Sequence, residues 1–281
     1  MKNTEEEKSS LRKMISSSQN QRVKEVVHLR RRRERDKQNR MLIEGYRQLL
    51  RAYENDYPVD ELFICRDLFQ GPNEEFLIEG FSARGTSIIE TAETPFCRMA
   101  YRDRPEGLLG VAPQVRKGLG DLQYDNAPFF LVAESIEKPG NLGTILRSVD
   151  AAGADGVIMC DSCTDLYNPN VVRASVGTLF TVQVAESTTD ETVEWMRENG
   201  VVPVLASPHA EVFYTEVDLT RPVAFVVGTE QYGLSEKWMR QEGIRCRIPM
   251  HGQADSLNVA STVTLLLYET VRQRQMSGPP A

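Results

Sequence analysis

The sequence from residue 129 onward alternates short apolar runs with helix-like segments, and this alternation limits the fold more than any other feature. The first run, residues 129–133, is continuously apolar, which is typical of a strand buried on both faces of a parallel sheet. Further strand-like runs occupy residues 157–160, 201–206, 223–227 and 245–249, and helix-like segments occupy residues 141–152, 171–180, 191–199, 235–241 and 256–274. This order predicts an α/β fold with a doubly wound parallel sheet.

The N-terminal third follows a different pattern and predicts a smaller mixed α/β unit. Residues 18–40 are helix-like with a thin apolar stripe, and residues 41–53 again have apolar side chains at helical spacing. Residues 59–65 and 86–90 have the composition of strands. The short apolar run 76–78 fits either a strand or a helix.

The net charge of −7 conceals an uneven distribution along the chain. Residues 1–40 contain 13 of the 33 Lys and Arg residues and 6 of the 40 Asp and Glu residues, a net charge of +7, so the remainder carries −14. A basic segment on an acidic body favours a local contact with a polyanion such as RNA, although a solvated helix face would give the same run. The candidate RNA-binding residues are Arg22, Lys24, Arg30, Arg31, Arg32 and Arg33.

Several chemistries have no support in the sequence. It has neither a Gly-x-Gly-x-x-Gly after the first apolar strand nor a Walker phosphate-binding loop nor a Gly-x-Ser-x-Gly nucleophile turn. The three histidines are not spaced as metal ligands, and Cys160 and Cys163 lack a second cysteine pair, so we expect no metal and two ordinary thiols. No apolar run approaches the ~20 residues of a membrane span, and residues 1–7 are too polar for a secretory leader. We therefore expect a cytoplasmic protein with no membrane contact.

Three polar turns join an apolar strand to a helix, at residues 139–143, 228–233 and 248–260. In the last turn the strand stops at Pro249 and the helix is expected to begin at Ser256. Such turns can aim backbone N–H and C=O groups, together with short side chains at the helix start, toward a ligand. A backbone-lined pocket between apolar strand ends suits a neutral heterocycle such as an adenosyl group better than a row of phosphates.

The three turns resemble the three signature motifs of the SpoU (TrmH-like) methyltransferases of the SPOUT superfamily. The first motif is Pro-x-Asn-x-Gly at residues 139–143, followed by a helix that carries Arg147. The second is Gly-x-Glu-x-x-Gly-Leu at residues 228–234, and the third combines Ile-Pro-Met at 248–250 with Ser-Leu-Asn at 256–258. The resemblance covers residues 129–274, with all three motifs in order.

The N-terminal third has a second resemblance. Residues 18–24 and 42–47 are similar to the substrate-binding extension of the rRNA ribose methyltransferases, a small domain like ribosomal protein L30e. The expected division is a basic N-terminal extension at 1–40, an L30e-like RNA-binding domain at 41–112, a linker at 113–127 and a catalytic domain at 128–275. Proline and glycine without periodicity support the linker.

The resemblance implies a fold and an activity that the residue pattern does not give by itself. It implies a deep trefoil knot in the catalytic domain, a homodimer, and S-adenosyl-L-methionine bound in the knot. The implied reaction is methyl transfer to a ribose 2′-hydroxyl of ribosomal RNA, with 23S rRNA as the expected substrate. Methylation of a tRNA ribose, or a non-catalytic role in RNA binding or ribosome assembly, remains open.

The resemblance also assigns roles to individual residues. Arg147 would lie at the 2′-hydroxyl, where a permanently charged guanidinium would bind the adjacent phosphate and stabilise developing alkoxide charge. Asn141 would orient Arg147 or the ribose, and Glu230 would pair with a cation or cap the helix that follows it. Ser256 and Asn258 would organise the site and the helix start. The expected cofactor-binding residues, acting chiefly through their backbone, are Gly228, Thr229, Ile248, Met250 and Leu257.

Overall fold

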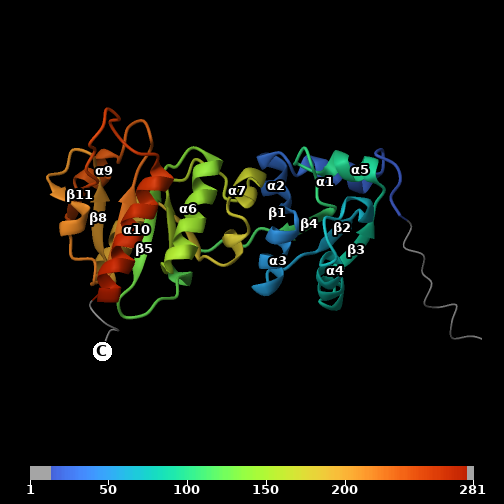
Figure 1. Cartoon of the computed structure of the whole chain (residues 1–281), viewed down its shortest axis with the longest axis horizontal. Helices are drawn as coiled ribbons and strands as arrows, with labels where there is room; N and C mark the ends of the chain where they lie inside the picture. Colours follow the sequence, from blue (N-terminus) through green and yellow to red (C-terminus); the bar gives the residue numbers. More distant parts are fainter. Residues whose placement is uncertain (1–13, 277–281) are drawn as a thin grey trace, which may run out of the picture. The chain divides into compact units, whose positions relative to one another are not determined.

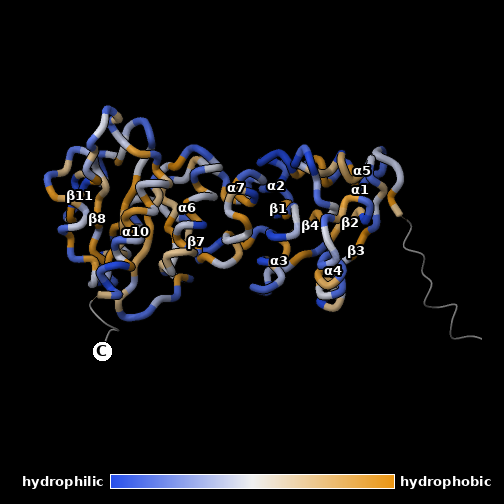
Figure 2. The backbone as a smooth tube through the Cα atoms, in the orientation of Figure 1, coloured by the Kyte–Doolittle hydropathy of each residue, from blue (hydrophilic) through white to orange (hydrophobic). Residues whose placement is uncertain are grey.

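The computed structural model describes residues 14–276 and divides them into two compact units, with the boundary between Gln114 and Val115 (Figure 1). Residues 1–13 of the expected basic extension lie outside the described residues. Each unit has its own sheet, and the strands of both sheets are among the most apolar stretches of the chain (Figure 2).

The first unit is a four-stranded sheet in the order β1-β4-β2-β3. Strand β4 pairs antiparallel with β1 and with β2, whereas β2 and β3 are parallel. Its elements are α1 (Gln21–His28), α2 (Arg32–Gln38), β1 (Arg40–Glu44), α3 (Tyr46–Glu54), β2 (Glu61–Ile64), the 3₁₀ turn η1 (Arg66–Leu68), α4 (Glu74–Ala83), β3 (Ser87–Glu90), α5 (Glu93–Met99) and β4 (Leu108–Pro113).

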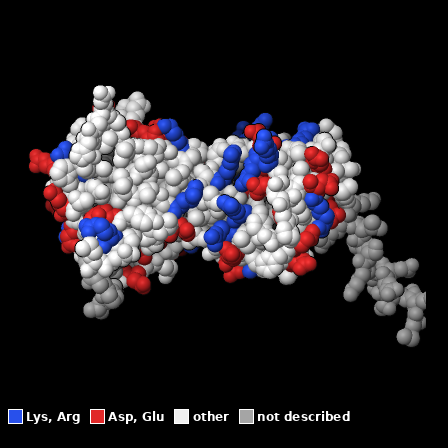
Figure 3. Space-filling view, viewed as in Figure 1, with Lys and Arg blue, Asp and Glu red and all other residues white. Residues whose placement is uncertain are grey.

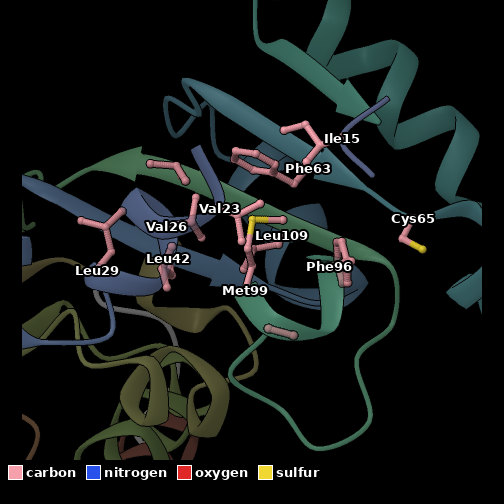
Figure 4. Close-up of a cluster of buried hydrophobic side chains, with 12 residues drawn as sticks. Ile15, Val23, Val26, Leu29, Leu42, Phe63, Cys65, Phe96, Met99 and Leu109 are labelled. Atoms are coloured by element: carbon pink, nitrogen blue, oxygen red, sulfur yellow. The ribbon is translucent and has the colours of Figure 1, made fainter. Parts of the chain in front are cut away.

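Helix α1 packs into the core of the first unit. Its buried residues Val23 and Val26, together with Leu29, lie in one apolar cluster with Phe63 and Phe96 (Figure 4). The apolar stripe expected over residues 18–40 is therefore present, but it is confined to α1 and its C-cap residue Leu29. The chain then breaks before a second, more polar helix, α2.

The prediction of a helix over residues 41–53 is wrong in its first part. Residues Arg40–Glu44 form β1, and α3 begins at Tyr46. Residues 41–44 are all buried, so the segment lacks the alternation that marks a half-buried strand. Gly45, with φ of 100°, turns the chain between the strand and the helix. The strands expected over 59–65 and 86–90 are confirmed as β2 and β3, and the ambiguous run 76–78 lies in α4.

The second unit contains a seven-stranded sheet in the order β7-β6-β5-β10-β8-β11-β9. Every neighbouring pair is parallel, which confirms the doubly wound parallel sheet. Its elements are η2 (Leu119–Asp121), β5 (Phe129–Glu134), α6 (Pro139–Ala152), β6 (Gly156–Cys160), α7 (Pro169–Ala174), η3 (Thr178–Phe180), β7 (Val184–Ser187), α8 (Thr189–Glu198), β8 (Val202–Ala206), β9 (Val212–Phe213), η4 (Tyr214–Glu216), β10 (Val223–Val227), α9 (Glu236–Met239), β11 (Ile244–Arg247) and α10 (Val259–Met276).

Helices cover both faces of this sheet. Alternate strand residues such as Phe130 and Val226 pack with Met196 of α8 and Trp238 of α9 in one apolar cluster. Helices α6 and α10 pack against each other on the other face, where Figure 1 shows them side by side. Burial on both faces explains why the central strands are continuously apolar.

Two parts of the second unit differ from the sequence expectation. The helix expected over 171–180 ends at Ala174, because Val176 and Gly177 have φ of 54° and 91° and turn the chain before η3. The short strands β7 and β9 were not expected, since each lies at an edge of the sheet and is only partly apolar.

Candidate functional site

The three motif turns meet at one edge of the second unit's sheet. They follow β5, β10 and β11, and the strand order places β10 beside β5, with β8 between β10 and β11. Because all these strands are parallel, their carboxyl ends lie along one edge, which we call the carboxyl edge. The order reverses at β5, with β6 on one side and β10 on the other, and ligands of open α/β sheets bind at such a switch point.

A chain of hydrogen bonds joins the three motifs. The side-chain amide of Asn141 donates to Glu230 Oε1, and Lys138 forms an ion pair with Glu230 Oε2. Asn258 Nδ2 donates to Asn141 Oδ1 at 3.2 Å, and Asn258 Oδ1 accepts from the backbone N–H of Ala260 at 3.0 Å. The fold thus brings together three of the predicted catalytic residues, one from each motif.

Glu230 takes one of the two structural roles expected for it. It pairs with a cation, Lys138, and it does not cap the following helix, because α9 begins at Glu236 with Ser235 as its N-cap. The backbone N–H of Ser235 instead donates to Glu134 Oε2 at 2.8 Å. Glu134 is a buried carboxylate at the end of β5 that ties the first motif to the second.

Sequence reasoning missed both Glu134 and Lys138. The signal for Glu134 is an acidic residue that ends an apolar strand and is followed by a motif turn. Lys138 precedes Pro139 and is the N-cap residue of α6. No sequence rule predicts that its side chain reaches a carboxylate 92 residues further along the chain.

Arg147 stands apart from this hydrogen-bond chain. Its side chain is exposed on α6 and has no hydrogen-bond or ion-pair partner among residues 14–276. Gly143 and Asp150, one turn before and one turn after it, lie against the end of α7 and the segment that follows it: a Cβ at Gly143 would lie 2.5 Å from Ala174 Cβ, and Asp150 accepts from Thr181. Arg147 therefore projects beside the 174–181 segment, free to meet a ligand.

The expected contact between Asn141 and Arg147 is not made. The amide of Asn141 is bonded to Glu230 and Asn258 instead. Asn141 and Arg147 are six residues apart on α6, which puts them about 120° apart around the helix. Whether Asn141 orients the ribose stays a prediction.

The last helix begins later than the sequence indicated. Helix α10 starts at Val259, so Ser256 and Leu257 lie in the exposed segment before it. Asn258 is the residue that caps the helix, because its side-chain oxygen accepts the N–H of Ala260. The prediction that Ser256 opens the helix is wrong. Asn258 takes that place: its oxygen accepts from Ala260 N–H, and its nitrogen donates to Asn141.

Up to Leu257, the backbone groups of the third motif lack backbone hydrogen-bond partners in the described residues. Residues 248–257 make no hydrogen bond to another backbone group within the described part of the chain. Ile248 and Met250 are half-buried, and Leu257 is 38% exposed. Residues 248–250 are half-buried and residues 251–257 are exposed. Since half-buried N–H and C=O groups need partners, residues 248–250 fit a ligand held by main-chain hydrogen bonds.

The second motif is a tight turn that depends on its own glycine. Thr229 and Gly233 exchange two backbone hydrogen bonds of 3.0 Å each. A Cβ at Gly228 would lie 2.1 Å from the carbonyl oxygen of Gly233, so any other residue would disrupt this turn. Gly228 is thus required by the fold, whether or not it also contacts a ligand. The end of β8, where Ser207 N–H donates to Cys246 O at 2.9 Å, lies on the same carboxyl edge; the strand was expected, but no site residue was proposed there.

Some of the candidate RNA-binding cations have a side-chain hydrogen-bond or ion-pair partner in the described residues, and others have none. Arg30 donates to the carbonyl oxygens of Arg98, at 2.7 Å, and Ala100, so it caps the end of α5. Arg22 forms an ion pair with Glu61, and Arg32 with Asp36 at 3.5 Å. Within the described residues, the candidates with no hydrogen-bond or ion-pair partner are Lys24, Arg31 and Arg33. Lys and Arg side chains gather over α2 and the β1–α3 region (Figure 3).

The cysteines and acidic residues give no sign of metal chemistry in the described part of the chain. No group of three or more His, Cys, Asp or Glu residues between 14 and 276 could hold a metal ion. Burial raises the pKa of the Cys160 thiol to about 12, and Cys163 is exposed. We also find that none of the described helices combines the length and apolar character needed to cross a membrane.

Comparison with known proteins agrees with this arrangement. The model of the SpoU rRNA methylase family matches residues 128–268, and that of the MRM3-like substrate binding domain matches residues 20–110. The 23S rRNA (uridine(2479)-2'-O)-methyltransferase of Streptomyces viridochromogenes is 33% identical over 261 residues, which cover 89% of this chain and 88% of that protein.

Two solved structures are similar over nearly the whole chain. One is an RNA 2′-O ribose methyltransferase, 37% identical with a TM-score of 0.82, covering 93% of this chain and 99% of its own. The other is an AdoMet-bound rRNA methyltransferase from Sinorhizobium meliloti, 30% identical with a TM-score of 0.85, covering 92% and 97%. Both family models, the similar fold and the three assembled motifs lead to one conclusion: this chain belongs to the SpoU rRNA methylase family.

Proposed function

We propose that this protein transfers a methyl group from S-adenosyl-L-methionine to a ribose 2′-hydroxyl of 23S ribosomal RNA. The observation that carries the proposal is the assembly of Asn141, Glu230 and Asn258, one from each motif, at the carboxyl edge. The relative from Streptomyces viridochromogenes methylates a 2′-oxygen of 23S rRNA, and the similar structure from Sinorhizobium meliloti contains AdoMet. Because the substrate is ribosomal RNA, we place the protein in the cytoplasm.

The third motif suits the adenosyl cofactor. Residues 248–257 offer main-chain groups without backbone partners in the described chain, and Ile248 and Leu257 offer apolar surface beside them. Backbone hydrogen bonds between apolar side chains suit an uncharged heterocycle. We propose Gly228, Thr229, Ile248, Met250 and Leu257 as the residues that hold it. The bound cofactor supplies a methyl group on a positively charged sulfur, which leaves as a neutral thioether.

The chain's own residues then align and activate the ribose. Arg147, exposed and without a side-chain partner in the described residues, binds the phosphate next to the reacting ribose and stabilises the negative charge that develops on O2′ as the hydroxyl proton passes to solvent water and the O–CH3 bond forms. Asn141 can accept a hydrogen bond through the second lone pair of its Oδ1, which orients the hydroxyl for attack. Glu230 and Asn258 keep that amide in one orientation.

The first unit supplies the RNA contact. We propose that Lys24, Arg31 and Arg33, whose side chains have no partner in the described residues, bind phosphates. Arg22 and Arg30 instead join separate elements of the unit, and Arg32 pairs with Asp36 within α2. We keep the functional division proposed from the sequence: a basic extension at 1–40, an RNA-binding domain at 41–112, a linker at 113–127 and a catalytic domain at 128–275.

The path of the chain supports the knot. After β11 the chain passes residues 248–258 and enters α10, which packs on α6 through a 2.7 Å hydrogen bond between Ser148 and Thr264. Because β8 and β10 lie between β11 and β5 in the sheet, this return crosses the carboxyl edge past the second-motif turn. We propose that it threads through the larger loop that runs from β10 through the second motif and α9 to β11, and so forms the trefoil knot.

We also propose the homodimer that the resemblance implies. On α10, Leu265 and Tyr268 are 40% and 47% exposed and lie on one side of the helix, so they form an exposed apolar surface beside the hydrogen bond of 3.4 Å that the Tyr268 hydroxyl donates to Ala151 O. A second copy would cover it.

The activity is tested by incubating purified protein with S-adenosyl-L-methionine labelled in its methyl group and with bulk rRNA or bulk tRNA. Label should enter rRNA and appear in 2′-O-methyl nucleosides after digestion. Label in tRNA alone would change the substrate, and label in neither RNA would favour a non-catalytic RNA-binding protein.

A further inference from the structure

In the hydrogen-bond chain at the carboxyl edge, the groups at the two ends determine which atom donates and which accepts in every bond. The Lys138 ammonium can only donate, the Glu230 carboxylate accepts both bonds that reach it, and the Ala260 N–H can only donate. The amides of Asn141 and Asn258 between them are therefore fixed with nitrogen toward Glu230 and oxygen toward α10. Lys138 is the only cation among the donors to Glu230 in the described chain.

Lys138 also sets the charge of this part of the site. With the ion pair made, Glu230 and Lys138 sum to zero and Arg147 remains as a free cation on the same helix. Six residues of helix separate Asn141 from Arg147, which is about 9 Å along the axis. The Glu230 carboxylate is bonded to Asn141, so it lies roughly this far from Arg147. At a Debye length of about 8 Å, salt reduces the repulsion between an uncompensated Glu230 and a phosphate beside Arg147 to about a third without abolishing it.

From this geometry we infer that Lys138 is a positioning residue for the RNA substrate: it neutralises Glu230 so that a phosphate can approach Arg147, without itself touching the RNA. The inference rests on the proposed function and deepens it, because it names a residue outside the predicted site. A lysine at an RNA-binding site can contact a phosphate directly or neutralise a nearby carboxylate, and we assign Lys138 the second role.

The ion pair is open to solvent, with 65% of the Lys138 side chain and 31% of the Glu230 side chain exposed. Exposed pairs contribute little to folding, so variants of either residue should fold. The test uses Lys138→Met, Lys138→Arg, Glu230→Gln and the double variant Lys138→Met/Glu230→Gln. Glutamine keeps an oxygen that accepts from Asn141 and removes the charge.

The first readout is the dissociation constant for 23S rRNA at fixed salt. Lys138→Met should weaken binding about two- to threefold, as expected for one uncompensated charge about 9 Å away at an effective dielectric constant of about 20 with salt screening. The double variant and Lys138→Arg should bind like wild type within the error of the measurement, because neither leaves a bare carboxylate. A double variant as weak as Lys138→Met would mean that Lys138 contacts RNA directly, and unchanged binding by Lys138→Met would remove its role altogether.

The second readout separates positioning from structure. Lys138→Met should raise KM for RNA while kcat changes less than about threefold, because Asn141 keeps its bond to Glu230. A fall in kcat with unchanged KM would contradict the inference. Lys237→Met is a matched control, since Lys237 also forms an exposed pair, at 2.8 Å with Asp190, and should leave both constants unchanged. A wild-type protein without methyl transfer would refute the proposed function, yet the RNA dissociation constants would still decide the role of Lys138.

Discussion

At the scale of single residues, Asn258 serves the helix and the site at once. Its oxygen caps α10 through the N–H of Ala260, and its nitrogen donates to Asn141. These two functions use different atoms of one amide, so substitutions can separate them.

We predict that Asn258→Asp keeps the helix cap but loses the donor to Asn141. Aspartate caps helices as well as asparagine does, so the stability should be close to that of wild type, whereas Asn258→Ala should lose about 1 kcal/mol. Both variants should lower methyl transfer at least about tenfold, because Asn141 is no longer held. Denaturant unfolding and turnover measure the two effects, and normal turnover by Asn258→Asp would contradict the role of the 3.2 Å bond.

Arg147 gives the second prediction at this scale. Arg147→Ala should leave the affinity for S-adenosyl-L-methionine within a few-fold of wild type and lower methyl transfer by at least about 100-fold, the range expected for a positioned electrostatic group. Lysine should restore little, since a point charge does not replace the guanidinium fork. Arg197→Ala, on the exposed side of α8, is the control. Near-normal turnover by Arg147→Ala would remove Arg147 from the site.

Sequence patterns identified the residues that lie inside motifs and missed those that depend on the fold. Asn141, Glu230 and Asn258 could be named because their spacing within the motif turns is visible in the chain. Lys138 and Glu134 could not, because their partners Glu230 and Ser235 are 92 and 101 residues away in sequence. Gly228 shows the reverse: the motif marked it for the cofactor, but its own turn already requires glycine, so Gly228→Val cannot test cofactor contact.

At the scale of elements, the basic run around α2 combines structural and free arginines. Replacing Arg31 and Arg33 with serine should lower the slope of log affinity against log salt for RNA by about 1.5, since each phosphate contact contributes about 0.7 to 0.9. Unfolding should be unaffected because neither side chain has a partner in the described chain. An unchanged slope would mean that both arginines belong to a solvated helix face.

Arg30→Met is the contrasting variant. It removes the donor to the carbonyl oxygens of Arg98 and Ala100, the first exposed and the second part-buried, so it should destabilise the first unit by about 1 to 2 kcal/mol, the lower part of the range for hydrogen bonds to charged groups. A substitution of the entire run from Arg30 to Arg33 would mix this loss with any loss of RNA contact.

The predicted helices were wrong where the apolar pattern suggested a helix but the backbone turns or extends. Residues 40–44 form β1 although they continue a helical apolar spacing, because the strand is buried on both faces and Gly45 ends it with a positive φ. The helix expected over 171–180 is interrupted at Val176, a β-branched residue with φ of 54° that no propensity rule anticipates. Both cases are decided by tertiary packing.

At the scale of the whole molecule, alternation predicted the parallel sheet but not its strand order. The order follows from how each crossover helix packs, and the placement of β10 beside β5 brings the motifs together. The expectation of a knot and of a dimer came from the resemblance alone, since periodicity contains no information on threading or on a second chain, and both stay proposals.

The dimer leads to a prediction at this scale. Wild-type protein should have twice the chain mass of 31.7 kDa in light scattering at micromolar concentration. Replacing Leu265 and Tyr268 with glutamate should give the monomer mass, because two charges would be buried against a second copy. A monomeric wild-type protein would contradict the homodimer and leave this α10 surface unexplained.

Methylation of a ribose 2′-hydroxyl in 23S rRNA by this protein would leave a modified nucleotide that can be located along the RNA. The most direct measurement maps 2′-O-methyl groups along rRNA from cells with the gene, without it, and with the gene carrying Arg147→Ala. We predict one 2′-O-methyl position in 23S rRNA that is present with the wild-type gene and absent in the other two. Identical maps from all three would contradict the account.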